Sequence, residues 1–155
     1  MMLSRRPRAW KWSDPMASLM RFEVLAPDKY VLKSDSISYV EAVTLWGGVG
    51  ILPRHAPLIA ALKEAPLKYR DAQGIAHFLC IQGGFMEVKD NKVVVMTEAA
   101  ETADEIDVDR AEASALRARE RLANPDDEID MDRVMGSLRR SEARLKTVRL
   151  AAESR

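Results

Sequence analysis

The residues best suited to chemistry are arginines in the last third of the chain. Arg133, Arg140 and Arg144 are spaced by 7 and 4 residues, so one face of a helix would present all three. Asp107 and Arg110 stand at the start of a preceding helical segment. If the two helices pack antiparallel, these groups converge on one anion, and guanidinium forks suit the geometry of phosphate. Spacing alone favours a solvated charged face, and a phosphate site is the competing interpretation.

Other candidate motifs favour structural roles. The glycine-rich stretch 47–53 lacks both the Gly-Lys-Ser/Thr sequence and the following helix of a phosphate-binding loop, so we expect its glycines to form a tight bend between strands. His55 lies between two prolines without a nucleophile motif nearby, which predicts a hydrogen-bonded structural histidine. Cys80, between Leu79 and Ile81, is expected to be a small core residue and not a reactive thiol.

Two further features of the first hundred residues have similar interpretations. His77 alternates with Phe78 in a predicted strand, so we expect a surface position or a contact with a partner. Gly83 and Gly84 favour a bulge or a sharp turn between strands. One cysteine and two histidines predict neither an internal disulfide nor a structural zinc site, and the sequence shows no acid/base pair that would indicate an independent enzyme.

The elements that must position these residues change character near residue 102. Before it, short apolar segments alternate with Gly and Pro turns and no helical pattern intervenes, which is typical of an all-β sandwich or flattened barrel. Turns are expected at 27–28, 71–74 and 89–91. The expected strands are 22–26, 30–32, 36–45, 50–52, 57–62, 67–70, 75–82, 85–88 and 92–97.

After residue 102 the hydrophobic period becomes helical. One stripe recurs at steps of 4, 3 and 4 and is mostly alanine, which allows a neighbouring helix to approach closely. A break at 124–127 contains the only proline of this region and separates two helices. The first stripe consists of Ala111, Ala115, Ala118 and Leu122, and the second of Met131, Val134, Leu138, Leu145 and Val148.

Both helices open with a similar phrase, at 106–110 and 129–133. Asp107 and Asp130 are expected N-caps, because a short carboxylate accepts hydrogen bonds from the free amides of the first turn. Gly136 should weaken the second helix by ~1 kcal/mol relative to alanine. The sequence thus predicts an α+β protein with an N-terminal all-β sandwich (20–101) and a C-terminal antiparallel two-helix hairpin (102–155).

Composition limits the remaining classes. The chain has 24 Lys+Arg and 24 Asp+Glu, so no basic field points to nucleic acid or anionic lipid. No apolar run approaches the ~18 residues of a membrane-spanning helix, so any membrane association is expected to be indirect, through a partner. Residues 1–19 form an Arg-rich extension that we expect to be disordered or to precede the true start, with an organelle transit peptide as the alternative.

Two phrases, in order, carry a resemblance to a known family. GILPRHAPL at 50–58 and GGFMEV at 83–88 resemble the epsilon subunit of bacterial and chloroplast F-type ATP synthases, whose mitochondrial counterpart is called delta. The order of sandwich and hairpin also agrees. The resemblance implies a non-catalytic central-stalk (rotor) subunit of a proton-translocating ATP synthase, which links the gamma subunit to the c-ring.

The resemblance also implies a regulatory ligand. The hairpin would lie folded on the sandwich or extend toward the catalytic alpha/beta head, where it impedes ATP hydrolysis. Some bacterial members bind ATP on the folded hairpin through Ile/Leu-Asp-x-x-Arg-Ala, and this chain has that phrase at 106–111. No cofactor is required, and the implied ATP site comprises Glu101, Ile106, Asp107, Arg110, Ala111, Arg133, Arg140 and Arg144.

Three positions depart from the family pattern. The family usually has Gly-Glu where this chain has Gly47-Gly48, Arg54 occupies a position that is often Gly or Asn, and Gly136 lies where stronger helix formers are common. The alternative functions are a stand-alone adenine-nucleotide-sensing module and a β-sandwich adaptor protein. The resemblance implies the cytoplasmic face of the bacterial inner membrane, with an organelle inner or thylakoid membrane as the alternative.

Overall fold

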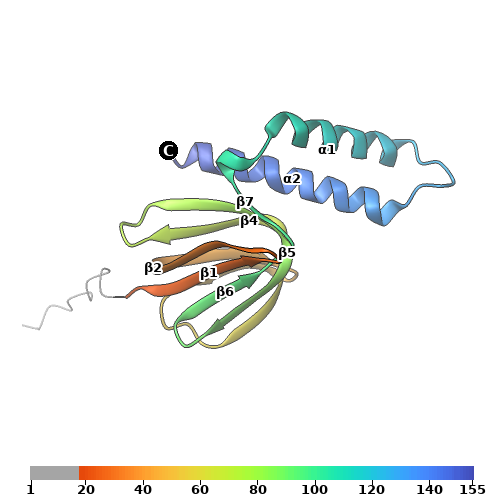
Figure 1. The fold of residues 1–155 in the computed structure, drawn as a ribbon. Coiled ribbons are helices and arrows are strands. Elements are labelled where there is room, and N and C mark those ends of the chain that lie inside the picture. The colour runs from red at the N-terminus through yellow and green to blue at the C-terminus, as the bar shows by residue number, and fades with distance from the viewer. Residues whose placement is uncertain (1–17) are drawn as a thin grey trace, which may run out of the picture.

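The computed structural model describes residues 18–155, so the predictions for the N-terminal extension lie, apart from its last two residues, outside the described residues. The strands are β1 (Met20–Ala26), β2 (Lys29–Thr44), β3 (Gly47–Ile51), β4 (Leu58–Asp71), β5 (Ala76–Lys89), β6 (Lys92–Met96) and β7 (Ala100–Thr102). These seven strands are followed by two helices that lie alongside them, next to β4 and β7, with the tip of the helical hairpin projecting beyond the strands (Figure 1). Within the described part, no helix combines the length and apolarity needed to cross a membrane.

The strands close into a flattened barrel. The hydrogen-bonded order is β1-β6-β5-β4-β2-β3, and β1 also pairs with β2, so the sheet returns on itself. The β1–β6 pair is parallel and the other pairs are antiparallel. The first half of β5 also pairs with the short β7, and its second half pairs with β6. Together with the helices that follow, this arrangement confirms the predicted α+β fold class.

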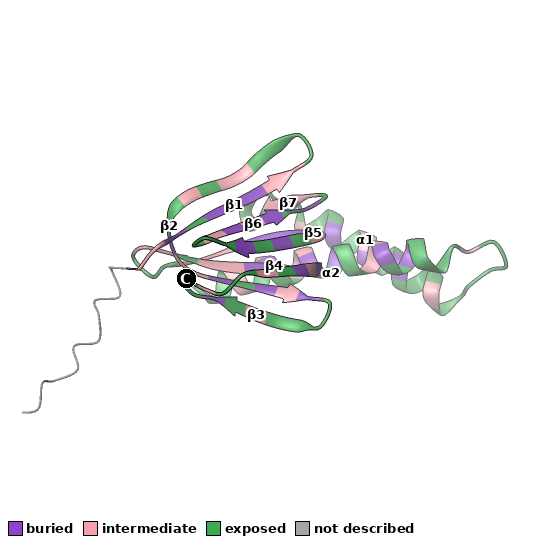
Figure 2. Cartoon of the chain, turned by 90° about the horizontal axis from the view of Figure 1, so that it is seen from below, coloured by how far each residue is buried: buried purple, intermediate pink, exposed green. Residues whose placement is uncertain are grey.

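The core of the barrel is built by alternate residues of the strands, because successive side chains of a strand point to opposite faces (Figure 2). Phe22 and Val24 of β1 are fully buried, and their register partners on the adjacent β6, Val93 and Val95, are buried beside them. Glu23 is only 5% exposed, and its Oε2 pairs with Lys92 Nζ at 3.1 Å. All buried residues of this core lie between positions 20 and 100, so the barrel core contains no residue of the helices.

Three strands are longer than the sequence predicts. The expected strands on either side of Pro66 join into β4, because Pro66 is accommodated opposite Cys80 without ending the strand. Similarly, β2 and β5 each merge two expected segments. The predicted tight bend between strands is present, but it lies at 45–46, earlier than expected, and residues 47–51 form β3. Gly47, with φ of 122°, closes this turn, and Gly50 makes room for the Tyr39 ring.

The predicted turns at 27–28, 71–74 and 89–91 are present. Asp90 and Asn91 both have positive φ, 51° and 58°, as a two-residue hairpin turn requires. Arg54 also has positive φ, 64°, and its amide donates to Asn91 Oδ1 at 2.9 Å. This left-handed backbone explains physically why Gly or Asn would suit position 54.

The sharp-turn prediction at the double glycine is also met, although β5 continues through it. Gly83 and Gly84 have φ of 75° and 102°, which bends the strand where its partner changes from β7 to β6. A Cβ at Gly84 would overlap the backbone carbonyl of Met96. Glycine is therefore required at this position by both backbone conformation and space.

The helices are α1 (Val108–Ala123) and α2 (Met131–Glu153), preceded by a short 3-10 turn, η2 (Ala103–Glu105). The alanines of the predicted first stripe, Ala111, Ala115 and Ala118, are buried against α2. α2 lies between α1 and the barrel and packs on β4 and β5, whereas α1 packs on α2 (Figure 1). The hairpin thus docks on the barrel through one helix.

The second predicted stripe describes only one of two buried faces of α2. Val134 is buried and Leu138, Leu145 and Val148 are partly buried, but Met131 is exposed. The other buried face carries Gly136, Ala143 and Thr147. Sequence reasoning missed this face because glycine, alanine and threonine give a weak hydrophobic signal. Its small side chains bring α2 close to the barrel.

Candidate functional site

Two matching rows of polar side chains run along one side of the helical hairpin. On α1 the row has the spacing 4, 3, 4, and on α2 it has the same spacing. Since residues at such steps share a helix face and the helices are antiparallel, the rows lie opposite each other. Ser114 Oγ and Ser137 Oγ meet between them at 3.4 Å. The rows are Arg110, Ser114, Arg117 and Arg121 on α1, and Arg133, Ser137, Arg140 and Arg144 on α2. We call them the arginine groove.

The caps at the helix starts set the position of the first arginine in each row. Asp107 Oδ1 accepts a hydrogen bond from the Arg110 amide at 3.0 Å. Asp130 Oδ1 accepts one from the Arg133 amide, also at 3.0 Å. Both predicted N-caps are therefore confirmed, and each aspartate is followed three residues later by an arginine of the groove.

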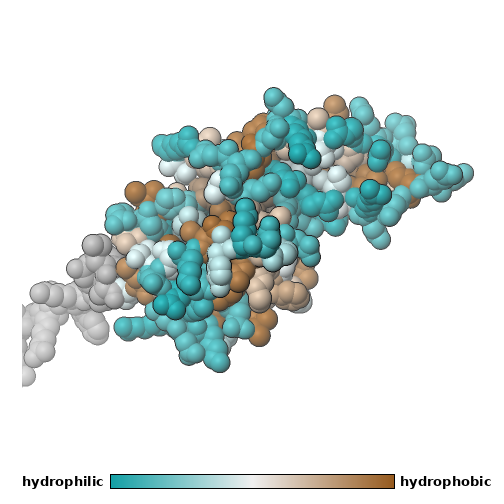
Figure 3. All heavy atoms as spheres, viewed as in Figure 1, coloured by the Kyte–Doolittle hydropathy of each residue, from teal (hydrophilic) through white to brown (hydrophobic). Residues whose placement is uncertain are grey.

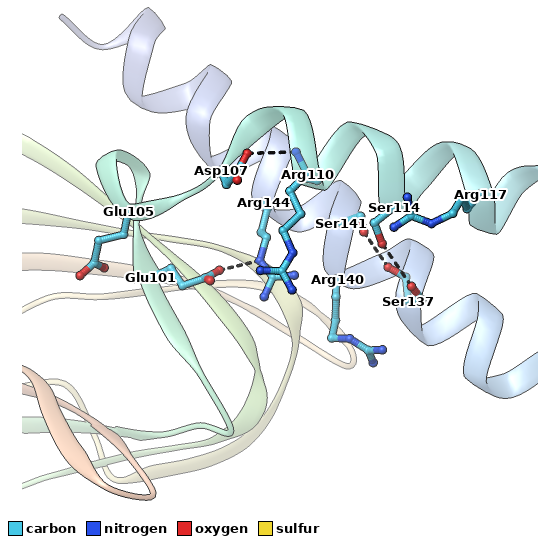
Figure 4. A pocket seen from close by; sticks show the side chains of 11 residues that line it. Glu101, Glu105, Asp107, Arg110, Ser114, Arg117, Ser137, Arg140, Ser141 and Arg144 are labelled. Atoms are coloured by element: carbon cyan, nitrogen blue, oxygen red, sulfur yellow. Dashed lines mark hydrogen bonds and ion pairs between the residues drawn. The ribbon is translucent and has the colours of Figure 1, made fainter.

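The end of the groove nearest the barrel is a hollow of about 320 Å³ between β7, η2 and the two helices (Figure 4). Arg110 and Arg144 lie side by side within it, and Arg144 Nε pairs with Glu101 Oε2 at 2.6 Å. We call this the proximal hollow. It is lined by Glu101, Glu105, Asp107, Arg110, Ala111, Ser114, Arg117, Ser137, Arg140, Ser141 and Arg144.

Most of the predicted ATP site lines this one hollow. Six of the eight predicted residues do so: Glu101, Asp107, Arg110, Ala111, Arg140 and Arg144. Ile106 is instead buried in a small apolar cluster with Cys80, Ala143 and Val148, beneath the hairpin. Arg133 lines a neighbouring hollow of about 280 Å³, nearer the hairpin tip. Binding of ATP itself remains a prediction.

Sequence reasoning missed five residues of the proximal hollow. These are Glu105, Ser114, Arg117, Ser137 and Ser141. The matching 4, 3, 4 spacing of the two rows was a signal that could have found Arg117 and both groove serines. Glu105 has a structural explanation: its Oε2 accepts from the Thr102 amide at 2.8 Å, and this bond lowers the pKa of the carboxyl group.

The chemistry of the proximal hollow is that of anion binding. Guanidinium groups and serine hydroxyls donate hydrogen bonds, and arginine forks match phosphate oxygens. Neither of the chain's two histidines lines it, so its serines have no histidine base beside them. Across residues 18–155, no three His, Cys, Asp or Glu side chains gather in a way that could hold a metal ion.

The remaining candidate residues have structural surroundings elsewhere. His55 Nδ1 lies 2.7 Å from the Ala56 carbonyl oxygen, in keeping with a hydrogen-bonded structural residue. His77, expected at the surface or a partner contact, bonds Asp71 Oδ2 through Nε2 at 2.8 Å, and this hydrogen bond lowers the pKa of Asp71. Cys80 is fully buried, and burial raises the pKa of its thiol to about 11. Cys80 is therefore a packing residue, as predicted.

The face of the hairpin seen in Figure 3 is predominantly hydrophilic, as its teal spheres show. A closed β-barrel with a docked polar hairpin defines a scaffold suited to contacts with partner subunits, and its groove carries side chains suited to an anion. Residues 19–103 match the family model described as ATP synthase, Delta/Epsilon chain, beta-sandwich domain. Residues 104–149 match the one described as ATP synthase, Delta/Epsilon chain, long alpha-helix domain. The chain belongs to the delta/epsilon chain family of ATP synthase, which confirms the resemblance seen in its motifs.

Curated relatives are consistent with this membership. The ATP synthase epsilon chain of Nitratidesulfovibrio vulgaris strain DP4 is 44% identical over 108 residues, which cover 70% of this chain and 79% of the relative. The ATP synthase epsilon chain of Carboxydothermus hydrogenoformans is 45% identical over 108 residues, with the same coverage. The chain is thus a non-catalytic ATP synthase subunit, part of a membrane-associated complex.

Two solved structures share the fold. A chain in the Euglena gracilis mitochondrial ATP synthase structure, described as OSCP/F1/c-ring in rotational state 1, aligns with a TM-score of 0.74 at 20% identity, covering 97% of this chain and 91% of that chain. A chain in the Tetrahymena thermophila mitochondrial ATP synthase central stalk/c-ring structure aligns with a TM-score of 0.51 at 21% identity, covering 86% and 94%. At these identities the comparison supports the fold.

Proposed function

We propose that this chain is the epsilon-type rotor subunit of a proton-translocating F-type ATP synthase, where it joins the gamma subunit to the c-ring. The observation that carries this proposal is the family match, which extends through both the barrel and the hairpin. Membership of this family argues against the two alternatives, a stand-alone nucleotide sensor and a generic adaptor. The cytoplasmic face of a bacterial inner membrane is the proposed location, supported by bacterial relatives.

An exposed apolar row on the barrel supports a tight protein contact. Phe85 of β5 and Met96 of β6 are register partners and are 57% and 49% exposed. The row continues to Leu25 on one side and to Ala61 on the other. A contiguous apolar patch on a folded protein marks an interaction surface, and large apolar residues are typical of interface centres. We assign this row to the gamma subunit.

A copurification experiment tests this assignment. Phe85→Glu combined with Met96→Lys should reduce recovery of the chain with its cognate gamma subunit by at least tenfold, because both substitutions place charges in the contact. Ile75→Lys is the matched control, since Ile75 is equally exposed but outside the row. Full recovery of the double variant would refute the assignment of this face. Sedimentation of the chain with inverted membrane vesicles would test the location.

The proximal hollow is proposed to bind regulatory ATP. Its arginines come from both helices and its carboxylate Glu101 from the barrel, so a ligand there contacts groups that are together only when the hairpin is docked. Such a ligand stabilises the docked form by RT ln(1 + L/Kd), where L is the free ATP concentration. A millimolar-range Kd would make the hairpin position follow the cellular ATP level.

Calorimetry on the full chain tests the nucleotide site. Arg140→Ala and Arg110→Ala should each weaken ATP binding by at least a few-fold, because each removes a guanidinium group from the hollow. Arg149→Ala is the matched control, since Arg149 lines neither hollow. If both groove variants bind ATP as the unmodified chain does, the site assignment is wrong.

The hairpin is proposed to regulate ATP hydrolysis by leaving its docked position. Its contact with the barrel has little apolar content, namely the cluster of Cys80, Ile106, Ala143 and Val148, and two arrangements can then differ by only a few kcal/mol. The test is to reconstitute the chain with a cognate catalytic head and to assay hydrolysis with and without residues 103–155. If hydrolysis is the same in both cases at low and high ATP, regulation by the hairpin is excluded.

A further inference from the structure

The arginine groove extends beyond the hollow proposed for ATP. From Arg110 to Arg121 the α1 row covers 11 residue steps, which corresponds to about 17 Å at 1.5 Å per step. Its far half is the neighbouring hollow of about 280 Å³, which we call the distal hollow. The two hollows share Ser114, Arg117, Ser137 and Arg140, so they are continuous. In Figure 4, Arg117 lies further along α1 than Arg110, on the side of the distal hollow.

The distal hollow differs from the proximal one in its charge balance. Arg117, Arg121, Arg133 and Arg140 line it, and no carboxylate does. Within residues 18–155, the ion pairs of the hairpin involve other arginines, namely Arg119, Arg139, Arg144 and Arg155. The proximal hollow, in contrast, has three carboxylates among its lining residues. The four arginines of the distal hollow therefore gather positive charge in one place, and none of them belongs to an ion pair of the described residues.

This concentration of charge is unfavourable unless an anion is present. Arg117 and Arg121 are four residues apart on α1, and like charges at this spacing destabilise a helix by about 0.2–0.5 kcal/mol. Arg133 approaches the same hollow from α2. The chain as a whole has zero net charge, so the cluster is a local property and not the result of a basic composition. A bound anion would relieve the repulsion.

The donor set favours phosphate. The side chains of Ser114 and Ser137 meet at 3.4 Å at the base of the groove, and each hydroxyl retains further hydrogen-bonding capacity. Guanidinium groups beside serine hydroxyls are the usual side-chain partners of phosphate oxygens. The volume of about 280 Å³ lies just below the range of about 300–1,000 Å³ for small-molecule sites, which suits an ion of one or two phosphates.

We infer that the distal hollow is a second phosphate-binding subsite, which takes either a free phosphate anion or the outer phosphates of a nucleotide that carries more than three. Only the second alternative, a nucleotide with more than three phosphates, rests on the proposed ATP site. The subsite itself requires the docked antiparallel packing of α1 and α2, and it does not require ATP in the proximal hollow.

Calorimetry with pyrophosphate at constant ionic strength tests the inference. Arg121→Gln combined with Arg133→Gln should raise the Kd for pyrophosphate at least fivefold, because both guanidinium groups belong to the distal hollow alone. Lys146→Gln combined with Arg149→Gln is the control, since it makes the same change in charge outside both hollows and should change the Kd less than twofold. Glutamine keeps a good helix propensity, and circular dichroism verifies that both variants fold.

Nucleotides distinguish the two sources of phosphate. If pyrophosphate binds equally well at saturating ATP, the subsite takes a free ion. The alternative is that one ligand spans both hollows. In that case ATP should displace pyrophosphate, and the unmodified chain should bind adenosine 5′-tetraphosphate more tightly than ATP. The Arg121→Gln/Arg133→Gln variant should show no such preference for the tetraphosphate. Equal pyrophosphate affinity in the groove and control variants, or no binding to the unmodified chain, would overturn the subsite. Loss of ATP binding with pyrophosphate binding retained would instead refute only the nucleotide site.

Discussion

Arg144 Nε of α2 lies 2.6 Å from Glu101 Oε2 of β7 and so joins the hairpin to the barrel across 43 positions of the chain. Both side chains are about one-third exposed, at 30% and 31%. Glu101→Gln should favour the undocked hairpin by about 1 kcal/mol, because it removes one charge of a partly solvated pair. The measurement is the fraction of undocked hairpin in the free chain, by fluorescence energy transfer between the barrel and the hairpin tip.

A double-mutant cycle isolates this pair. Arg144→Gln alone and the combination with Glu101→Gln complete the cycle, and we expect a coupling energy of about 0.5–1 kcal/mol. Strictly additive effects would show that the two side chains do not hold the hairpin together. Arg119→Gln, which affects the pair between Arg119 and Glu142 within the hairpin, controls for general loss of charge.

The thiol of Cys80 should report the docking of α2. Cys80 is fully buried in the cluster beneath the hairpin, so a thiol reagent should react at least tenfold more slowly with the full chain than with a chain lacking residues 103–155. Saturating ATP should slow the reaction further if it stabilises docking. Equal rates for the full and shortened chains would show that α2 does not shield the thiol.

The same thiol predicts how docking depends on pH. Burial raises its pKa from 9.0 to about 11, so the docked form retains the proton that the undocked form loses. This contribution is complete below pH 9 and is lost as pH rises from 9 to 11, by about tenfold in the docking equilibrium per pH unit. Cys80→Ala should remove this dependence. The energy-transfer measurement between pH 8 and about 11 checks it.

The two capping aspartates should separate helix stability from ligand binding. Asp107→Ala and Asp130→Ala each remove one cap hydrogen bond and should each lower the free energy of unfolding of the hairpin by about 1 kcal/mol. Only Asp107 lines the proximal hollow, so only its replacement should also alter ATP affinity directly. Thermal unfolding and calorimetry on both variants provide the comparison. If the Asp130 variant loses as much ATP affinity as the Asp107 variant, the effect is on folding alone.

Gly84 should be the most sensitive glycine of the barrel. Gly84→Ala forces a side chain into a backbone with φ of 102° and against the Met96 carbonyl, so we expect a loss of more than about 2 kcal/mol in the free energy of unfolding. Gly48→Ala is the matched control, because a Cβ there meets nothing within 4 Å. Urea denaturation of the two variants measures the difference. A tolerated Gly84→Ala would mean that β5 can straighten.

Local signals made much of the fold predictable. The period change near residue 102, the alanine stripe of α1 and the aspartate caps depend on residues a few positions apart, and all three are present in the structure. The lengths of β2, β4 and β5 depend on pairing with distant strands, which periodicity cannot show. Pro66 illustrates this: it indicates a strand end in isolation, yet lies within β4 opposite Cys80.

The candidate site was predictable where helix periodicity applied. Spacing placed Arg140 and Arg144 on one face and Asp107 at a helix start, and these residues line one hollow. The sequence could not predict that the Ile106 side chain points away from the hollow, because its burial beside Cys80 depends on where α2 meets the barrel. The docking face of α2 was missed for the same reason: Ala143 and Thr147 are recognisable as contact residues only once their neighbour is known.

Along the edge opposite β4, strand β5 has two successive neighbours, β7 and then β6. Its first half pairs with β7, which carries Glu101, and its second half carries Phe85 of the exposed apolar row. The apolar row and the Glu101 ion pair are therefore linked through β5, which carries Phe85, bends at Gly83 and Gly84, and pairs through Cys80 with Glu101 of β7. If the proposed partner sits on that row, we expect a displacement there to reach β7 along the hydrogen-bonded backbone of β5.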